Sequence, residues 1–300
     1  ARVRVVNDNR RPTNGSAVAV RENMVVTSCH GTRNASLISV MNGGQRWQVK
    51  SVTRDGEHDL CLLELSEANL KTFPLAEPST TLELGDYVAA VGFAGPTLTI
   101  AEGTVKALHQ HDNARVIQTD AAFRIGESGG ALVNREGKLV GILTFYLAGE
   151  KEGAYFALPA AWVERLVQSA VSRQAPVSQP DVSFWERPDE ERALFLRALA
   201  REYTEDWKGL KQVASQWVVQ ESENAEAWIA LGKSHFYIDE VGAAAKALRE
   251  AIRLAPRHAE GWLYLGRSSV ALKDAGGFEE ALQRLETLDL LAAEALRKMH

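Results

Sequence analysis

The sequence predicts a protein of two domains, with a β-rich domain first and an all-α domain after it. Short strand-like runs separated by turn residues fill residues 16–145, a rhythm typical of a β-sandwich or a β-barrel. Residues 172–188 are rich in Pro, Ser and Gln, which is the composition of a linker. The remainder changes to Ala, Leu, Glu and Arg and repeats with a period of 34 residues, which predicts stacked helical hairpins.

Length and composition agree with two globular domains. A protein of 300 residues exceeds the usual size of one domain. The formal net charge of −5 argues against a general binder of nucleic acids or anionic membranes. No apolar run reaches the roughly 18–20 residues that a membrane-spanning helix needs. The sequence begins at Ala1 rather than Met, so we expect that a preceding segment, a secretory signal or an anchor, was removed.

The strand-like runs are rich in apolar and β-branched residues, and Gly, Asn and Asp interrupt them. The sequence predicts strands at residues 18–20, 25–27, 37–41, 47–52, 87–92, 97–105, 115–119, 131–134 and 138–145. Residues 159–171 then show helical periodicity, with Trp162, Leu166 and Val167 on one face. We expect this helix to close a first domain of residues 1–171.

The strongest candidate for chemistry lies in residues 123–146. Its centre, residues 126–130, reads GESGG. Glycines on both sides let the backbone adopt positive φ and leave the Ser128 hydroxyl uncovered. A tight turn can also aim the N–H groups of Gly126 and Ser128 at one point, which an oxyanion hole requires. The alternative is a Gly-rich β-hairpin with an incidental serine.

A nucleophilic serine needs a base, and the base needs a group that orients it. His30 ends the β-branched run NMVVTSCHGT of residues 23–32, and Asp59 precedes the apolar run of EHDLCLLEL, residues 57–65. Taken alone, each residue is more often a surface or capping residue. The order His30, Asp59, Ser128 is, however, one of three sequence orders known for the catalytic triad.

These blocks resemble the signatures of chymotrypsin-type serine peptidases, namely TSCH at 27–30, HDLCLL at 58–63 and GESGG. The sequences IQTDAA at 117–122 and GAYFALP at 153–159 are similar to those of the bacterial HtrA/Deg branch. The resemblance covers about residues 14–171 and implies a chymotrypsin-like double β-barrel with the active site between the barrels. It also implies a periplasmic or otherwise exported protein.

The same resemblance implies the roles of the site residues. Ser128 would be the nucleophile, His30 the general base and Asp59 the group that orients the imidazole. The N–H groups of Gly126 and Ser128 would bind the oxyanion. No metal and no organic cofactor is implied.

Substrate contacts follow from the resemblance as well. The substrate backbone is expected to add as a strand beside residues 143–146, which makes Leu143, Thr144 and Tyr146 candidate contacts. Ala122 would lie at the base of the pocket for the residue that precedes the cleaved bond, where it offers no charge. Tyr146 lies about where a glycine opens that pocket in trypsin. The implied specificity is cleavage after small or medium aliphatic residues.

Two features depart from the family pattern. Glu127 stands where HtrA enzymes usually have Asn and trypsin-like zymogens have Asp. It could face solvent, pair with a cation such as Arg124, or hold the loop inactive, and we favour the solvent-facing hypothesis. In addition, helical repeats follow the peptidase-like region in place of PDZ domains, and the trimer-forming extension of the family is short here. We therefore expect a monomer.

The two cysteines, Cys29 and Cys61, each lie beside a proposed triad residue. A disulfide would fit an oxidising compartment, whereas two buried apolar thiols fit the sequence equally well. In the linker, Phe184 and Trp185 could anchor this segment to a domain. We expect a fragment ending near Val171 to retain cleavage of small peptides.

The second domain, residues 189–300, resembles about three tetratricopeptide repeats. Residues 34 apart share a type: Leu194, Trp228 and Trp262 form one set, and Ala198, Gly232 and Gly266 form another. The middle repeat matches best, with Trp228, Leu231, Gly232, Ala244, Ala251 and Pro256 in the expected places. The third departs from register, as if residues 273–276 lengthened its turn. Stacked repeats form a concave surface, which predicts binding of a protein partner, the alternative being a rigid brace for the first domain.

Two functions are therefore predicted. The first is a serine endopeptidase that acts on a protein or peptide substrate and recruits a partner through its repeats. The second is an adaptor whose peptidase domain is catalytically silent or autoinhibited and works only by protein binding. The intact set of His30, Asp59 and Ser128 favours the enzyme.

Overall fold

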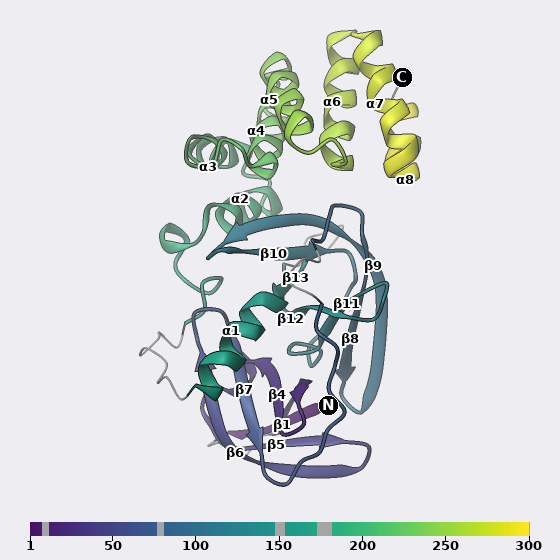
Figure 1. Ribbon diagram of the computed structural model, residues 1–300. Helices are drawn as coiled ribbons and strands as arrows, with labels where there is room; N and C mark the ends of the chain where they lie inside the picture. The colour runs from purple at the N-terminus through teal and green to yellow at the C-terminus, as the bar shows by residue number, and fades with distance from the viewer. Residues whose placement is uncertain (8–11, 77–80, 148–153, 173–181, 300) are drawn as a thin grey trace. The chain divides into compact units, whose positions relative to one another are not determined.

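The computed structural model describes residues 1–7, 12–76, 81–147, 154–172 and 182–299. These residues form two compact units, Ala1–Arg187 and Pro188–His300, which are described separately below (Figure 1). Much of the predicted linker, residues 173–181, lies outside the described residues. None of the helices in the described ranges has the length and apolarity needed to span a bilayer.

The first unit begins with an antiparallel sheet in the strand order β2-β1-β5-β6-β7-β4-β3. Its strands are β1 (Arg2–Asn7), β2 (Pro12–Ser16), β3 (Val18–Arg21), β4 (Met24–Ser28), β5 (Ala35–Asn42), β6 (Gln45–Asp55) and β7 (Leu60–Leu65). The inward-facing residues form one buried cluster that includes Val3, Val25, Val40, Leu63 and Leu65. The alternation of buried and exposed residues follows from the two-residue period of a strand.

The second half of this unit is a closed barrel in the order β10-β13-β12-β11-β8-β9 (Figure 1). Its strands are β8 (Tyr87–Ala94), β9 (Thr97–His111), β10 (Ala114–Thr119), β11 (Ala131–Asn134), β12 (Leu139–Leu147) and β13 (Ala154–Pro159). Val88, Ile117, Leu132 and Leu143 fill its interior. Two barrel-like sheets in succession confirm the expected chymotrypsin-like architecture.

Helix α1 (Ala160–Val171) follows the second barrel, as the periodicity predicts. It buries Trp162, Val163, Leu166 and Val167, so the predicted apolar face is the packed face. Burial of one such stripe is what stabilises a helix of this length in water.

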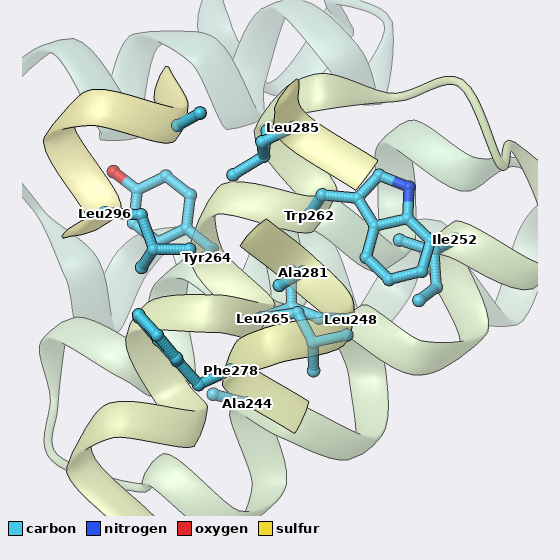
Figure 2. Close-up of a cluster of buried hydrophobic side chains, with 11 residues drawn as sticks. Ala244, Leu248, Ile252, Trp262, Tyr264, Leu265, Phe278, Ala281, Leu285 and Leu296 are labelled. Atoms are coloured by element: carbon cyan, nitrogen blue, oxygen red, sulfur yellow. The ribbon is translucent and has the colours of Figure 1, made fainter. Parts of the chain in front are cut away.

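The second unit consists of helices α2 (Leu194–Tyr203), α3 (Trp207–Gln220), α4 (Ala225–Tyr237), α5 (Val241–Leu254), α6 (Ala259–Leu272), α7 (Ala275–Leu288) and α8 (Leu290–Arg297). Short connections between them favour antiparallel neighbours. Several helices begin at polar N-caps, such as Asp206, Asn224 and Asp274, whose side chains accept a first-turn N–H bond. Figure 2 shows the buried cluster of the last helices, in which Leu248, Trp262, Leu265 and Leu285 pack together.

The helices of this unit repeat along the sequence. Helices α4 and α6 begin at Ala225 and Ala259, and α5 and α7 begin at Val241 and Ala275, which is 34 residues in each case. The expected lengthening of the turn at residues 273–276 is wrong, because α6 ends at Leu272 and α7 begins three residues later. Phe278 and Ala281 are buried, as are Ala244 and Ala247 at positions 34 residues earlier, so the third repeat keeps the register.

Candidate active site

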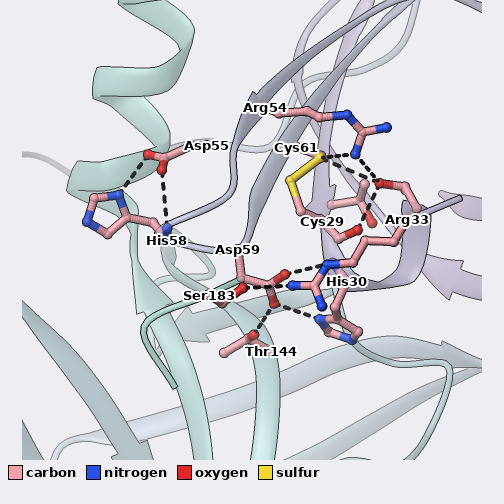
Figure 3. Close-up of a disulfide and its surroundings, with 12 residues drawn as sticks. Cys29, His30, Arg33, Arg54, Asp55, His58, Asp59, Cys61, Thr144 and Ser183 are labelled. Atoms are coloured by element: carbon pink, nitrogen blue, oxygen red, sulfur yellow. Dashed lines mark hydrogen bonds and ion pairs between the residues drawn. A yellow bond between two sulfur atoms is a disulfide. The ribbon is translucent and has the colours of Figure 1, made fainter. Parts of the chain in front are cut away.

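The first-barrel strands β4 and β7 bring His30 and Asp59 together. They pair antiparallel, with Ser28 opposite Leu60, so the end of one strand lies beside the start of the other. His30 follows β4 in a short 3-10 turn, and Asp59 directly precedes β7. The imidazole Nδ1 lies 2.6 Å from Asp59 Oδ2, and the backbone N–H of His30 donates to Oδ1 at 2.7 Å (Figure 3).

Asp59 is fully buried and lies at a positive φ of 56°. Thr144 on β12 donates its hydroxyl to Asp59 Oδ2 at 2.7 Å, which gives the carboxyl group a third hydrogen bond. A buried carboxylate is tolerated only when such bonds replace water. The contact between Asp59 and Thr144 joins the two barrels, and no local feature of the sequence predicts it.

The environment of His30 changes its acidity. Burial by itself would lower the pKa of His30, but the hydrogen bond to Asp59 and the charges of Asp59 and Glu186 outweigh it and raise the pKa above its usual range. The neighbouring Arg33 guanidinium opposes this rise. Because a carboxylate only accepts, Nδ1 carries the proton, and the neutral imidazole leaves Nε2 as its basic atom.

Ser128 lies in the loop between β10 and β11. Its hydroxyl donates to the backbone carbonyl of Thr144 at 2.9 Å, and its own carbonyl accepts from the N–H of Ser16 at 3.0 Å. The next residue, Gly129, donates to the carbonyl of Leu143 at 2.7 Å. Within the described residues, no hydrogen bond joins His30 to Ser128. Thr144 is instead in contact with both Ser128 and Asp59, so it brings the predicted nucleophile next to the His–Asp pair.

The turn before Ser128 has the geometry that the glycines predict. Glu127 donates its N–H to the backbone carbonyl of Arg124 at 2.9 Å, and Gly126 takes a φ of +98°, a value that favours glycine. In the part of the protein that the structure describes, no protein group accepts a bond from the N–H of Gly126 or of Ser128. Both predicted oxyanion donors are therefore uncommitted.

Comparison with known proteins identifies the first unit. Residues 15–142 match the family model described as a trypsin-like peptidase domain. The first unit is similar to the trypsin-like peptidase domains of HtrA/DegP proteins. The periplasmic serine endoprotease DegP of Salmonella typhimurium is 37% identical over 167 residues, which is 52% of this protein and 35% of DegP. The periplasmic pH-dependent serine endoprotease DegQ of Escherichia coli is 33% identical over 168 residues, or 52% of this protein and 37% of DegQ.

Solved structures agree. The HtrA-type protease AlgW with tripeptide is 29% identical with a TM-score of 0.51, over 58% of this protein and 60% of AlgW. The Rv3671c protease of M. tuberculosis in its active form has a TM-score of 0.51 over 60% of this protein and 81% of its own length, and at 18% identity it shows the fold alone. The match spans little more than a third of the length of the curated relatives, 35% of DegP and 37% of DegQ.

The expectation that Glu127 faces solvent is wrong. Only 4% of the residue is exposed. Its Oε1 accepts from the Thr99 hydroxyl at 2.6 Å, and its Oε2 accepts from the backbone N–H of Arg124 at 2.9 Å. Gly92 makes room for it, because a Cβ there would lie 2.7 Å from the Cβ of Glu127. The buried Glu127 carboxylate thus stabilises the turn before Ser128.

The predicted substrate contacts lie in different surroundings. Ala122 is exposed and 41% of the surface of Tyr146 is exposed to solvent, so both can contact a bound peptide. Thr144 is buried. Leu143 is fully buried and its carbonyl accepts from Gly129, so the isobutyl group of Leu143 has no access to substrate. The sequence alone does not show which residues of 139–147 are buried and which are exposed, because this strand is apolar almost throughout.

Cys29 and Cys61 form a disulfide, with their Cα atoms 4.9 Å apart. The bond joins the residue before His30 to the strand that follows Asp59. It therefore ties together the two strand ends that hold the His–Asp pair (Figure 3). Among the described residues, no group of three or more His, Cys, Asp or Glu residues is arranged to hold a metal ion.

One contact of the site comes from beyond the predicted peptidase domain. Trp185 lies with its ring centroid 5.7 Å from that of His30, in an edge-to-face arrangement. The composition of residues 172–188 indicates a linker, and its two aromatic residues are the only signal in the sequence for this contact.

Proposed function

We propose that this protein is a serine endopeptidase that hydrolyses peptide bonds with Ser128, His30 and Asp59. The observation that supports it most is the bond between His30 Nδ1 and Asp59, because it fixes the tautomer with a basic Nε2. The imidazole of His30 keeps 27% of its surface exposed, so a substrate can reach it.

The first half of the reaction forms an acyl-enzyme. A rotation about the Cα–Cβ bond of Ser128 moves its Oγ from the carbonyl of Thr144 to Nε2 of His30. Oγ attacks the scissile carbonyl while Nε2 takes the hydroxyl proton, and the resulting imidazolium then protonates the leaving amine. Resting hydrogen bonds of catalytic groups often differ from those in the substrate complex.

The second half repeats these steps with water. Nε2 takes a proton from water, the hydroxide attacks the acyl carbonyl, and Ser128 leaves with the returned proton. In both halves the N–H groups of Gly126 and Ser128 hold the oxyanion, each donor being worth about 3 kcal/mol in related sites. The mechanism uses no metal and no organic cofactor.

The relatives support a protein or peptide substrate and an exported protein. DegP and DegQ are named periplasmic serine endoproteases, and AlgW was solved with a tripeptide. A disulfide between Cys29 and Cys61 fits an oxidising compartment such as the periplasm. We therefore propose a periplasmic location.

We also propose a substrate preference and a strand edge for binding. The substrate backbone would pair beside Thr144 and Tyr146, with Ala122 at the base of the pocket for the residue before the cleaved bond. An alanine offers no charge to a basic residue, and Tyr146 narrows the space. A peptide-library profile should therefore show small or medium aliphatic residues at that position, and dominance of Arg or Lys would contradict the assignment.

For the helical unit we propose a tetratricopeptide array that recruits a protein partner. The 34-residue spacing of α4 and α6 and of α5 and α7 supports this. Gly232 and Gly266 occupy equivalent helix positions, and each lies against a buried leucine, Leu248 and Leu296 respectively. Such close contacts are typical of paired helices in repeat proteins.

The test is the change of Ser128 to alanine. If the three residues act as a unit, Ser128→Ala lowers peptide turnover by about six orders of magnitude. A fluorophosphonate probe should label the wild-type protein and the Ser51→Ala control but not Ser128→Ala. Absence of both labelling and hydrolysis in the wild-type protein would instead favour the adaptor function.

A further inference from the structure

The segment Ser183–Arg187, called the clasp here, lies outside the region matched by the peptidase family model yet packs into the peptidase domain. It belongs to the first compact unit, which ends at Arg187. Phe184 is 1% exposed, and its N–H donates to the backbone carbonyl of Glu57 at 3.0 Å. The clasp thus approaches the loop that holds Asp59, two residues after Glu57.

Ion pairs hold the clasp to residues that are close in sequence to His30 and Asp59. Arg33, three residues after His30, donates from Nη1 to Glu186 Oε1 at 2.8 Å and from Nη2 to the other carboxylate oxygen. Its Nη2 also donates to the Ser183 hydroxyl at 3.1 Å, a contact visible in Figure 3. Arg187 pairs with Glu57 at the other end. A two-bond guanidinium–carboxylate pair fixes direction as well as distance.

Trp185, which directly precedes Glu186 in sequence, contacts the His30 imidazole. Its ring meets that of His30 edge-to-face at 5.7 Å and 90°. It also stacks on Phe145, with centroids 4.8 Å apart and planes at 20°. Phe145 is the neighbour of Thr144, which bonds to Asp59 and Ser128. The indole N–H is buried and finds no acceptor among the described residues, so ring contacts and the clasp ion pairs, not a hydrogen bond, set the position of Trp185.

We propose that Trp185 is a positioning residue for the general base. It holds the His30 imidazole against Asp59 with Nε2 directed to the nucleophile, and the ion pairs of Arg33 and Arg187 hold Trp185 in turn. The proposal rests on the proposed peptidase function. A bond at Nδ1 alone leaves the ring able to swing outward, whereas a second contact on the ring removes that freedom. Catalytic groups need such support from neighbouring packed residues.

The experiment uses the full-length protein with four variants. Trp185→Ala should lower kcat on a short peptide about tenfold or more while KM stays within about twofold, since small misplacements of a catalytic group are costly. Trp185→Phe keeps a ring at the site and should recover most of the loss. Glu186→Gln should give a smaller fall, and Lys50→Ala, which removes the exposed ion pair to Glu64, should give none.

A second measurement does not depend on turnover. The downfield proton resonance of the His30 Nδ1–H, identified by its loss in Asp59→Asn, should broaden or disappear in Trp185→Ala and persist in Trp185→Phe and Lys50→Ala. If the wild-type protein shows no hydrolysis that depends on Ser128, the proposed function is wrong. The His30 resonance would still test whether Trp185 positions the imidazole. If Trp185→Ala fails to fold, the Glu186→Gln variant tests the proposal instead. It removes the charge that pairs with Arg33 and leaves every aromatic ring in place.

Three results would overturn the proposal. An unchanged kcat and an unchanged resonance in Trp185→Ala would show that the clasp is only packing. A rise in KM with constant kcat would make Trp185 a wall of the substrate site. A rise in kcat would make it an obstruction that the enzyme must displace.

Discussion

At the scale of single residues, the site depends on how each polar group is satisfied. The carboxyl group of Asp59 is fully buried and accepts bonds from His30 and Thr144. Glu127 is also buried and accepts from Thr99 and Arg124. Both arrangements replace water with protein donors. The bonds to Glu127 thus hold the turn before Ser128, and the bonds to Asp59 hold His30.

The raised pKa of His30 predicts the pH dependence of the enzyme. The base works only when neutral, so kcat/KM should rise with pH through a midpoint above about 6.5, the ordinary pKa of histidine. Glu186 favours the imidazolium and Arg33 opposes it. Glu186→Gln should therefore lower the midpoint, and Lys50→Ala should leave it unchanged. A midpoint at or below the ordinary value, or an upward shift in Glu186→Gln, would contradict this reasoning.

The buried position of Glu127 predicts that it supports the oxyanion hole. Asparagine at this position is too short to reach both Thr99 and the N–H of Arg124, so the turn that aims the N–H of Gly126 should loosen. Loss of one oxyanion donor costs about 10²–10³ in kcat in related enzymes, and we expect Glu127→Asn to lower kcat at least tenfold. Thr99→Val removes one of the two bonds that Glu127 accepts and should have a smaller effect. A tenfold rise in basal turnover would show instead that Glu127 holds the loop inactive.

At the scale of elements, both units depend on close approaches that only small residues allow. In the peptidase domain, a Cβ on Gly129 would lie 2.2 Å from the carbonyl oxygen of Ser16, and its φ is +84°. In the helical unit, Gly232 of α4 lies against Leu248 of α5. Glycine is otherwise unfavourable inside a helix by about 1 kcal/mol. Its presence at Gly232 therefore reflects packing between helices rather than helix formation.

Two glycines of the helical unit provide a matched test. A Cβ on Gly232 would lie 2.5 Å from Cγ of Leu248, which is fully buried, so neighbouring side chains would have to shift. Gly232→Ala should lower the free energy of unfolding by about 1–3 kcal/mol. Gly242 in α5 has nothing within 4 Å of the same position, so Gly242→Ala should raise that energy by up to about 1 kcal/mol. Urea unfolding followed by circular dichroism measures both, and stabilisation by Gly232→Ala would refute the packing argument.

At the scale of the whole molecule, the compact peptidase unit is longer than the region that the family model matches. The family model matches residues 15–142, whereas the compact unit extends to Arg187 and includes the clasp. Pro188 then begins the helical unit. The clasp is thus followed directly in sequence by the proposed repeats.

Two fragments test where the peptidase unit ends. A fragment ending at Arg187 should hydrolyse a short peptide with a kcat close to that of the full-length protein, since it keeps the clasp. A fragment ending near Val171, which the sequence predicts to be active, should lose about tenfold or more because His30 lacks its contact with Trp185. Both should lose a partner that binds the helices. Equal activity of the two fragments would show that the functional peptidase domain ends near Val171.

The sequence by itself determined the features whose signals are local. The two-residue and 3.6-residue periods predicted the strands and the packed face of α1, and the 34-residue period predicted the helix pairs. The glycines around Ser128 predicted a positive φ, which Gly126 and Gly129 adopt. Each of these depends on neighbours within one turn or one repeat, so a single sequence is enough to predict them.

Only the tertiary structure decided the features that join distant segments. Thr144 lies 85 residues from Asp59, and Arg33 lies 153 residues from Glu186. The choice between a disulfide and free thiols at Cys29 and Cys61 likewise depended on the pairing of β4 with β7. Glu127 faces inward because Gly92 and Thr99 leave a polar space for it. No periodicity or turn chemistry encodes such contacts, because their energy depends on which surfaces the folded barrels bring together.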